Sequence, residues 1–271
     1  VFMFQPGEET AGGAKEMVDE GVLTAAGPLV DAAYSLHVFS AGAPRGLCVG
    51  RPGLIMAAAD LLNVTVHGRG GHGSAPQAAL DPVPALCEMV LGTQVLLGRH
   101  FDIFDPAVIT VGKIQAGTAA NVIPDSGSFE ATLRSFSPPA RQKLADLLPP
   151  MLKGIADAHL VSVDVDVQQK FPPTSNDPAQ TQFAARIAQQ LFGETRYQTL
   201  PTPLPGSEDF SYVLNEVPGA YLGLSAVPEG VDPMTAPYNH SPLAVYDDGI
   251  LADQTALLAS LALQNPAVVI P

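Results

Sequence analysis

The stretch VFMFQPGEET, residues 1–10, predicts how the first part of the chain folds. A hydrophobic run stops at Gln5-Pro6-Gly7, and two adjacent carboxylates, Glu8 and Glu9, follow at the turn. Buried strands often end in this way where the edge of a sheet carries a site. One carboxylate of such a pair can bind a metal while the other takes a proton from water. Taken alone, however, the stretch is better explained as a solvated acidic turn before a helix, whose N-terminus favours carboxylates.

A helix and a second strand follow this stretch. Apolar side chains at residues 14–18 have helical spacing and lead to Gly21, a typical C-terminal cap. Residues 31–38 have the pattern of a strand that ends on His37. A strand-helix-strand unit places the C-terminal ends of both strands at one edge of a parallel sheet. We therefore expect Glu8, Glu9 and His37 to be neighbours, although His37 by itself is more simply explained as a histidine bonded to backbone.

The pattern changes near residue 60, which predicts a second domain inserted into the first. Asp81-Pro82 starts a helix, because aspartate caps helix N-termini and proline fits the first helical position. The predicted order is β-α-β-β-α-β, that of a ferredoxin-like sandwich. Its elements are a strand at 61–67, a helix at 82–99, strands at 107–115 and 127–136, a helix at 138–159 and a strand at 162–171.

The chain then returns to the first domain. We expect a helix at 179–192, a short helix after Gly206 that ends near Asn215, a strand at 220–225 and a final helix at 246–263. The fold class is therefore α/β. A sheet domain formed by residues 1–59 and 172–271 is interrupted by an α+β domain at residues 60–171.

Composition limits the function classes. The 271 residues are 46% hydrophobic and 15% charged, as in a globular protein. A net charge of −14 argues against nucleic acid and anionic membrane surfaces as partners. No apolar run has the length of a membrane span, and no basic segment of a signal peptide precedes the first strand pattern. Two cysteines, Cys48 and Cys87, indicate a reducing, cytoplasmic location, and we expect both to be small buried hydrophobes.

Several chemistries are excluded. GRGGHG at residues 68–73 fits G-x-G-x-x-G, but Pro76 separates it from the next helix, whereas a dinucleotide site needs the helix to open inside the glycines. The sequence contains neither a P-loop motif nor G-x-S-x-G. A metal site remains, with Glu9, His37 and His240 as ligands from separate loops. Mixed carboxylate and imidazole ligands suit zinc, manganese, cobalt or nickel.

Six ordered motifs resemble those of the M20 family of metallopeptidases over essentially the whole chain. They are QPGEE (5–9), LHV (36–38), RGGH (69–72), NVIP (121–124), GSEDF (206–210) and NHSP (239–242). The resemblance is strongest to the amidohydrolase branch, which includes hippurate hydrolases, indole-3-acetyl-amino-acid hydrolases and N-acetyl-diaminopimelate deacetylases. It implies a partial, mixed-sheet catalytic domain and an inserted domain that serves as dimerisation lid.

The resemblance also implies roles for single residues. Glu8 matches the general base that activates the attacking water. Glu9, His37 and His240 match metal ligands of a site that holds two divalent ions in the family. The reaction it implies is hydrolysis of the amide bond of an N-acyl amino acid or a related small amide. A carboxypeptidase or dipeptidase of the same family is the alternative, which His37 in place of an acidic ligand weakens.

The inserted domain carries the other matching residues. His72 matches a histidine that reaches the active site of the second subunit of a homodimer and binds the oxyanion. Asn121 and Arg134 match groups that hold the free carboxylate of the substrate. An arginine fork suits a carboxylate, and an imidazole donor suits a developing oxyanion. A non-catalytic dimeric binding protein built from this domain is a further alternative.

The chain departs from the family at its start. M20 enzymes have a further N-terminal part with additional metal ligands, which residues 1–271 lack, so we expect this chain alone to hold an incomplete site. A piece of an active hydrolase explains this better than a truncated, inactive product. Glu208-Asp209 fits a helix cap and a site residue pair equally well. The remaining histidines match no motif and are expected to be ordinary polar residues: His67, His100 and His159.

Overall fold

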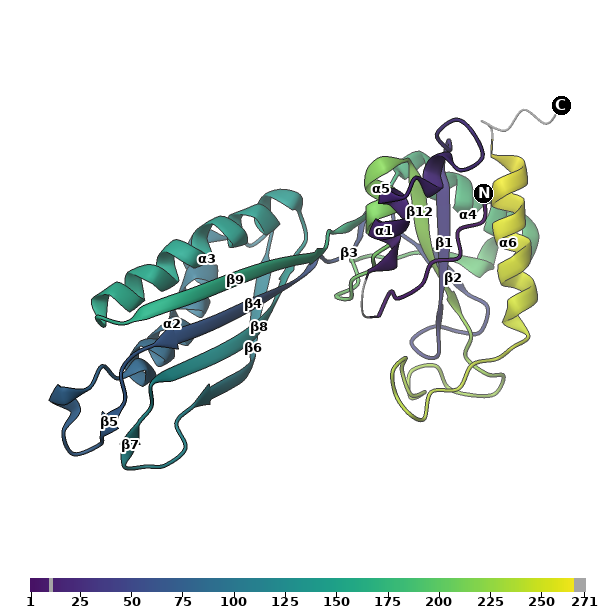
Figure 1. Cartoon of the computed structure of the whole chain (residues 1–271). Helices are drawn as coiled ribbons and strands as arrows, with labels where there is room; N and C mark the ends of the chain where they lie inside the picture. Colours follow the sequence, from purple (N-terminus) through teal and green to yellow (C-terminus); the bar gives the residue numbers. More distant parts are fainter. Residues whose placement is uncertain (10–11, 266–271) are drawn as a thin grey trace. The chain divides into compact units, whose positions relative to one another are not determined.

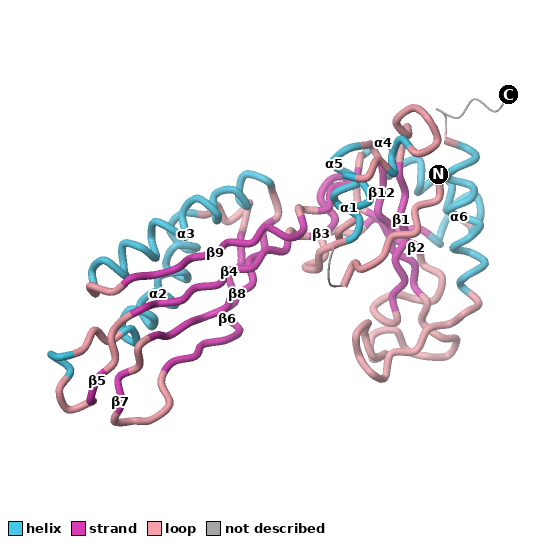
Figure 2. The backbone as a smooth tube through the Cα atoms, viewed as in Figure 1, coloured by secondary structure: helices cyan, strands magenta, loops and turns pink. Residues whose placement is uncertain are grey.

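The structure is a computed structural model that describes residues 1–9 and 12–265. It divides into two compact units, shown in Figures 1 and 2, which we describe separately. Unit 1 comprises residues 1–56 and the chain from residue 174 onward, and unit 2 comprises Ala57–Pro173. Among the described helices, none combines the length and the apolar character needed to cross a bilayer.

Unit 1 is built on a mixed sheet of four strands in the order β1-β12-β2-β11. The pairs β1·β12 and β2·β11 are parallel, and β12·β2 is antiparallel, which confirms the predicted mixed α/β class. These strands are β1 (Ala33–Phe39), β2 (Cys48–Gly50), β11 (Tyr197–Thr199) and β12 (Gly219–Ser225). The other elements are α1 (Gly13–Asp19), β3 (Gly53–Met56), β10 (Thr174–Asn176), α4 (Pro178–Phe192), α5 (Ser211–Glu216) and α6 (Ile250–Gln264).

Strand β12 is buried at every position because helices cover both faces of the sheet. Leu222 and Leu224 pack into a core with Phe183 of α4 and Leu257 of α6. Alternate side chains of a strand point to opposite faces, so Tyr221 belongs to a second core, which includes residues of α1 and α5. The loop before α5 therefore lies on the Tyr221 face of the sheet.

The predicted strand at the start of the chain is absent, and this prediction was wrong. Residues 1–7 form no ladder with any described strand, and Phe2 and Phe4 are 89% and 87% exposed. The parallel neighbour of β1 is β12, from the opposite end of the chain, so the predicted βαβ unit does not form. Hydrophobic content identifies a segment suited to a strand, but pairing depends on a partner that the local pattern does not specify.

Other boundaries of unit 1 differ less from the predictions. Helix α1 ends as predicted, since Gly21 follows it in the left-handed conformation with φ of 87°. Strand β1 runs two residues beyond His37, to Phe39, and α6 begins at Ile250 instead of residue 246. Strands β10 and β11 were missed because each has three residues, too few to show a period.

Unit 2 contains an antiparallel sheet in the order β6-β8-β4-β9 with two long helices. Leu62, Val64 and Val66 of β4 alternate with more exposed residues and pack against both helices. The two helices are capped by the side chains of Asp81 and Ser137, each of which accepts a hydrogen bond from a backbone N–H at 3.0 Å. The elements are β4 (Ala59–His67), β5 (Gly71–His72), α2 (Pro82–His100), β6 (Ala107–Ala116), β7 (Val122–Ile123), β8 (Ser126–Ser135), α3 (Pro138–Ala158) and β9 (Ser162–Phe171).

The two cysteines differ in environment. Cys48 is buried on β2, and burial raises the pKa of its thiol well above the usual value. Cys87 lies on α2 and is exposed, so its predicted burial was wrong. Leu91 and Val95 follow it at four-residue intervals and are 68% and 63% exposed. Because such intervals return to the same side of a helix, the three residues form an exposed apolar stripe, which we call the α2 stripe.

Candidate functional site

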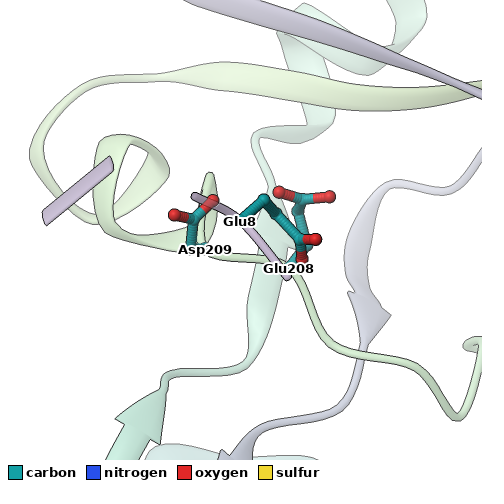
Figure 3. A group of neighbouring side chains, drawn as sticks. All are labelled: Glu8, Glu208 and Asp209. Atoms are coloured by element: carbon teal, nitrogen blue, oxygen red, sulfur yellow. The ribbon is translucent and has the colours of Figure 1, made fainter. Parts of the chain in front are cut away.

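Three carboxylates from two distant segments meet in unit 1 (Figure 3). Glu8 lies in the turn before α1, whereas Glu208 and Asp209 lie directly before α5. One oxygen of each carboxylate lies within 4.8 Å of the others. Burial, followed by the charges of Glu9 and Asp209, raises the pKa of Glu8. Burial and then the charge of Glu8 raise the pKa of Glu208 well above its usual range.

Glu208 is held by two hydrogen-bond donors. The hydroxyl of Tyr221 and the backbone N–H of Phe210 both donate to its carboxylate, the latter at 3.3 Å. Asn176 holds the backbone of Tyr221 on both sides, since its amide nitrogen donates to the Tyr221 carbonyl at 2.9 Å and its oxygen accepts the Tyr221 N–H at 2.8 Å. The central strand thus orients Glu208 toward Glu8.

Asp209 does not cap the helix that follows it. Helix α5 has no side-chain cap, and Asp209 accepts hydrogen bonds from the Gln5 side chain and from the Ala14 backbone N–H. Of the two interpretations left open for Glu208-Asp209, the helix cap therefore does not hold for Asp209. The sequence pattern could not separate the two interpretations because the donors lie about two hundred residues away.

His37 has a defined tautomer. Its Nδ1 lies 2.8 Å from the backbone oxygen of Val38, and a carbonyl can only accept, so Nδ1 carries the proton of the hydrogen bond. In the neutral ring, Nε2 is left with a lone pair, as a metal ligand requires. The rings of Phe39 and Tyr221 flank the imidazole, with centroids 5.4 and 6.3 Å away.

His240 lies opposite Glu9. Its Nε2 is 3.5 Å from a carboxylate oxygen of Glu9, and its backbone φ is 71°, a left-handed conformation that costs about 1 kcal/mol or more for a residue other than glycine. The neighbouring Asn239 holds this loop, since its amide nitrogen donates to the Val38 carbonyl at 2.8 Å. The Val38 oxygen therefore bonds both to His37 and to the His240 loop.

The residues of unit 1 suit a divalent cation. Glu9 and His240 face each other and His37 is linked to the His240 loop, although these three do not form one group within 4.8 Å. Among the described residues that spacing is met by Glu8 with Glu208 and Asp209. Carboxylate and imidazole donors suit zinc or another borderline divalent metal, and a cation would offset the repulsion inside the carboxylate cluster.

His72 and Asn121 are neighbours in unit 2. Strands β5 and β7 pair His72 with Val122, and the Gly73 N–H donates to the Asn121 carbonyl at 2.9 Å. The backbone N–H of Ser74 donates to His72 Nδ1 at 3.2 Å, so Nδ1 is an acceptor and the proton lies on Nε2. His72 therefore presents an N–H donor, the opposite of His37.

Arg134 lies on β8 with one guanidinium nitrogen, Nη1, buried and without a hydrogen-bond partner among the described residues. Burial lowers the pKa of Arg134, and the charge of Asp60 opposes this shift. A buried donor without a partner is costly, so a ligand whose oxygen accepts a hydrogen bond from Nη1 would be bound favourably.

Comparisons with known proteins identify relatives along the whole chain. The profile of "Peptidase family M20/M25/M40" matches residues 1–264. IAA-amino acid hydrolase ILR1-like 4 of Arabidopsis thaliana is 34% identical over 97% of this chain, which spans 59% of that relative. Hippurate hydrolase of Campylobacter jejuni is 31% identical over 96% of this chain, and this chain spans 66% of that relative. The chain therefore covers less than two thirds of the length of these relatives.

Solved structures agree with the sequence relatives. A Bacillus subtilis protein described as a dinuclear metal-binding peptidase of the M20 family has a TM-score of 0.76 and 26% identity. That match covers 98% of this chain and 65% of the other. Because the family profile matches residues 1–264, nearly the whole chain, the chain belongs to peptidase family M20/M25/M40.

Proposed function

We propose that the protein acts in metal-dependent hydrolysis of the amide bond of N-acyl amino acids or related small amides. The observation that carries this proposal is the adjacent pair Glu8 and Glu9. Glu8 is half-buried beside the buried carboxylates of Glu208 and Asp209, whereas Glu9 faces His240. This arrangement separates a proton acceptor from a metal ligand, and the relatives named as hydrolases of amino-acid conjugates support the substrate class.

The metal would be held by Glu9, His37 and His240. The lone pair on His37 Nε2 supports its part in this set. A bound divalent ion supplies Lewis acidity that polarises a carbonyl and acidifies water. Zinc, manganese, cobalt and nickel all suit these donors, and the dinuclear relative supports two ions per site.

Glu8 is the proposed general base. Its carboxylate accepts a proton from the attacking water and then returns it to the departing amine. The raised pKa of Glu8 favours both proton transfers, because a base whose pKa lies nearer the operating pH can both take and release a proton.

His72, Asn121 and Arg134 are proposed to bind substrate. The Nε2–H of His72 suits an oxyanion, because the Ser74 N–H leaves the ring proton on that nitrogen. The Nη1 of Arg134 has the unused donor capacity that a substrate carboxylate requires. Asn121 directly precedes β7, its carbonyl accepts the N–H of Gly73 next to His72, and it offers a side-chain amide.

Metal content and a substrate panel test the proposal. We expect the chain, in its full-length form, to bind one or more divalent ions and to cleave hippurate or another N-acyl amino acid faster than dipeptides. Chelation should abolish turnover, and readdition of metal should restore it. Preference for dipeptides would indicate a carboxypeptidase or dipeptidase. Less than one ion per chain together with no cleavage would contradict an enzyme and leave the dimeric binding protein.

We also propose that unit 2 is a ferredoxin-like dimerisation lid that joins two copies of the protein. Its strand order, β6-β8-β4-β9, is the order expected of that fold. Strand β6 is an edge strand, and α2 carries the exposed α2 stripe. An open edge and an exposed apolar surface favour association with a second copy.

Substitutions in the α2 stripe test the dimer. We expect the double variant Leu91→Glu with Val95→Glu to raise the dimer dissociation constant about a hundredfold or more. Each of the two side chains, once buried in the interface, contributes about 1.5 kcal/mol or more to the free energy of association. Sedimentation equilibrium measures this constant. Leu160→Glu is the matched control, since Leu160 is 77% exposed in unit 2 but lies outside the stripe. Equal dissociation constants for the double variant and the control would exclude the stripe from the interface.

A further inference from the structure

We propose that Asp209 is a positioning residue that holds the Glu8-Glu9 turn from both of its ends. The proposal rests on the role of Glu8 as general base given above. It assigns a task to a buried acidic residue that the hydrolytic mechanism itself does not use.

The carboxylate of Asp209 bridges two points of the N-terminal segment. One oxygen accepts a hydrogen bond from the side-chain amide of Gln5, and the other accepts the backbone N–H of Ala14 at 3.0 Å. Gln5 precedes the Glu8-Glu9 turn and Ala14 follows it. Asp209 is fully buried, so water does not compete strongly for either bond.

The bond to Ala14 meets a need that α1 cannot meet itself. Ala14 lies in the first turn of α1, where backbone N–H groups have no partner inside the helix. The N-cap residue is Gly12, which has no side chain to accept a hydrogen bond. Asp209 therefore replaces the missing cap from a distant part of the chain, and the start of α1 is tied to the loop before α5.

Two contacts join the described residues on either side of the Glu8-Glu9 turn. The Gly12 N–H donates to the Gly7 carbonyl at 2.9 Å. Gly13 packs so closely on Pro6 that an added Cβ would lie 2.1 Å from the Pro6 carbonyl oxygen. Because these contacts join Pro6 and Gly7 to Gly12 and Gly13, holding Gln5 and Ala14 also restrains Glu8, which follows Gly7 directly.

The position of Glu8 matters for the rate. A general base must lie within hydrogen-bond reach of the proton that it removes, and a displacement of about 1 Å can lower a rate on the order of a hundredfold. Glu208, which precedes Asp209, faces Glu8 from the same loop. Asp209 thus sets the distance between the base and its carboxylate neighbours.

Kinetics of four variants test the proposal. We expect Asp209→Ala to lower kcat on the order of a hundredfold with KM unchanged, and Gln5→Ala, which removes one of the two bonds, to lower kcat less. Asp209→Asn should recover most of the rate, since its oxygen can accept the Ala14 N–H while its amide donates to a rotated Gln5. Asp177→Ala is the matched control. It removes the cap of α4, a 2.8 Å bond to the Gln180 N–H, and should lower stability without lowering kcat.

Hydrogen exchange supplies a readout that is independent of turnover. The Ala14 amide should exchange slowly in the wild type, faster in Asp209→Ala and at an intermediate rate in Asp209→Asn. Unchanged exchange at Ala14 in Asp209→Ala would show that the bridge is absent in solution. An unchanged kcat of Asp209→Ala beside an active wild type would overturn the positioning role alone. A metal-loaded wild type that cleaves no substrate of the panel would overturn the proposed function itself.

Discussion

Glu8→Ala should lower kcat by about a hundred- to ten-thousand-fold while the metal content stays near that of the wild type. The loss is expected because the variant has no carboxylate to take the proton from water. The metal is retained because Glu9, His37 and His240 are unchanged. Steady-state kinetics together with elemental analysis of the purified protein measures both quantities.

Glu9→Ala is the matched control for this experiment. It removes the adjacent carboxylate, the one that lies 3.5 Å from His240, and we expect it to lose metal as well as activity. Loss of metal in Glu8→Ala with retention in Glu9→Ala would mean that the two glutamates have exchanged roles. Glu8→Gln keeps the size of the side chain, and it should be as inactive as Glu8→Ala if the proton transfer is what has been lost.

Arg141→Ala should destabilise unit 2 by about 3–5 kcal/mol. Arg141 binds Asp60 through two hydrogen bonds of 2.7 and 2.8 Å, and Asp60 is 4% exposed. Asp60 also accepts the Lys170 backbone N–H at 2.8 Å, so this carboxylate joins α3 to β4 and β9. Removal of the guanidinium leaves a buried carboxylate without the counter-ion that is hydrogen-bonded to it, which accounts for the large cost.

Urea unfolding followed by far-ultraviolet circular dichroism measures the destabilisation, and exchange of the β4 amides assigns it to unit 2. Lys153→Ala is the control, because Lys153 lies on the same helix and pairs with Asp157 at 71% and 63% side-chain exposure. An exposed pair of this kind contributes less than about 1 kcal/mol. If Arg141→Ala lowers the free energy of unfolding as little as the control does, the buried pair does not stabilise unit 2.

Helices were predicted well because their signals are local. Asp81 and Ser137 stand directly before α2 and α3, and each accepts the backbone N–H that an N-cap residue should accept. Long strands such as β4 and β9 were predicted for the same reason, since β4 alternates over nine residues and β9 alternates through Val163, Val165 and Val167. A pattern of this kind needs no knowledge of the rest of the chain.

Errors arose where a property depends on a distant partner. Residues 1–4 have the composition of a strand but no described strand pairs with them, whereas β1 pairs with β12, nearly two hundred residues later. Cys87 has an apolar side chain, yet the side of α2 that carries it faces away from the core. The sequence left open whether Glu208-Asp209 caps α5, because the donors to Asp209 are Gln5 and Ala14 at the other end of the chain.

The sequence by itself determined the type and approximate bounds of most elements and the order of the motifs, and it supplied the candidate residues for the proposed metal-assisted hydrolysis. Only the tertiary structure decided which of these residues meet. It brought Glu208 and Asp209 to Glu8, placed His240 opposite Glu9 and assigned opposite tautomers to His37 and His72. The physical reason is that helix caps and periodicity act over a few residues, whereas hydrogen bonds, burial and charge act between any groups that the fold brings together.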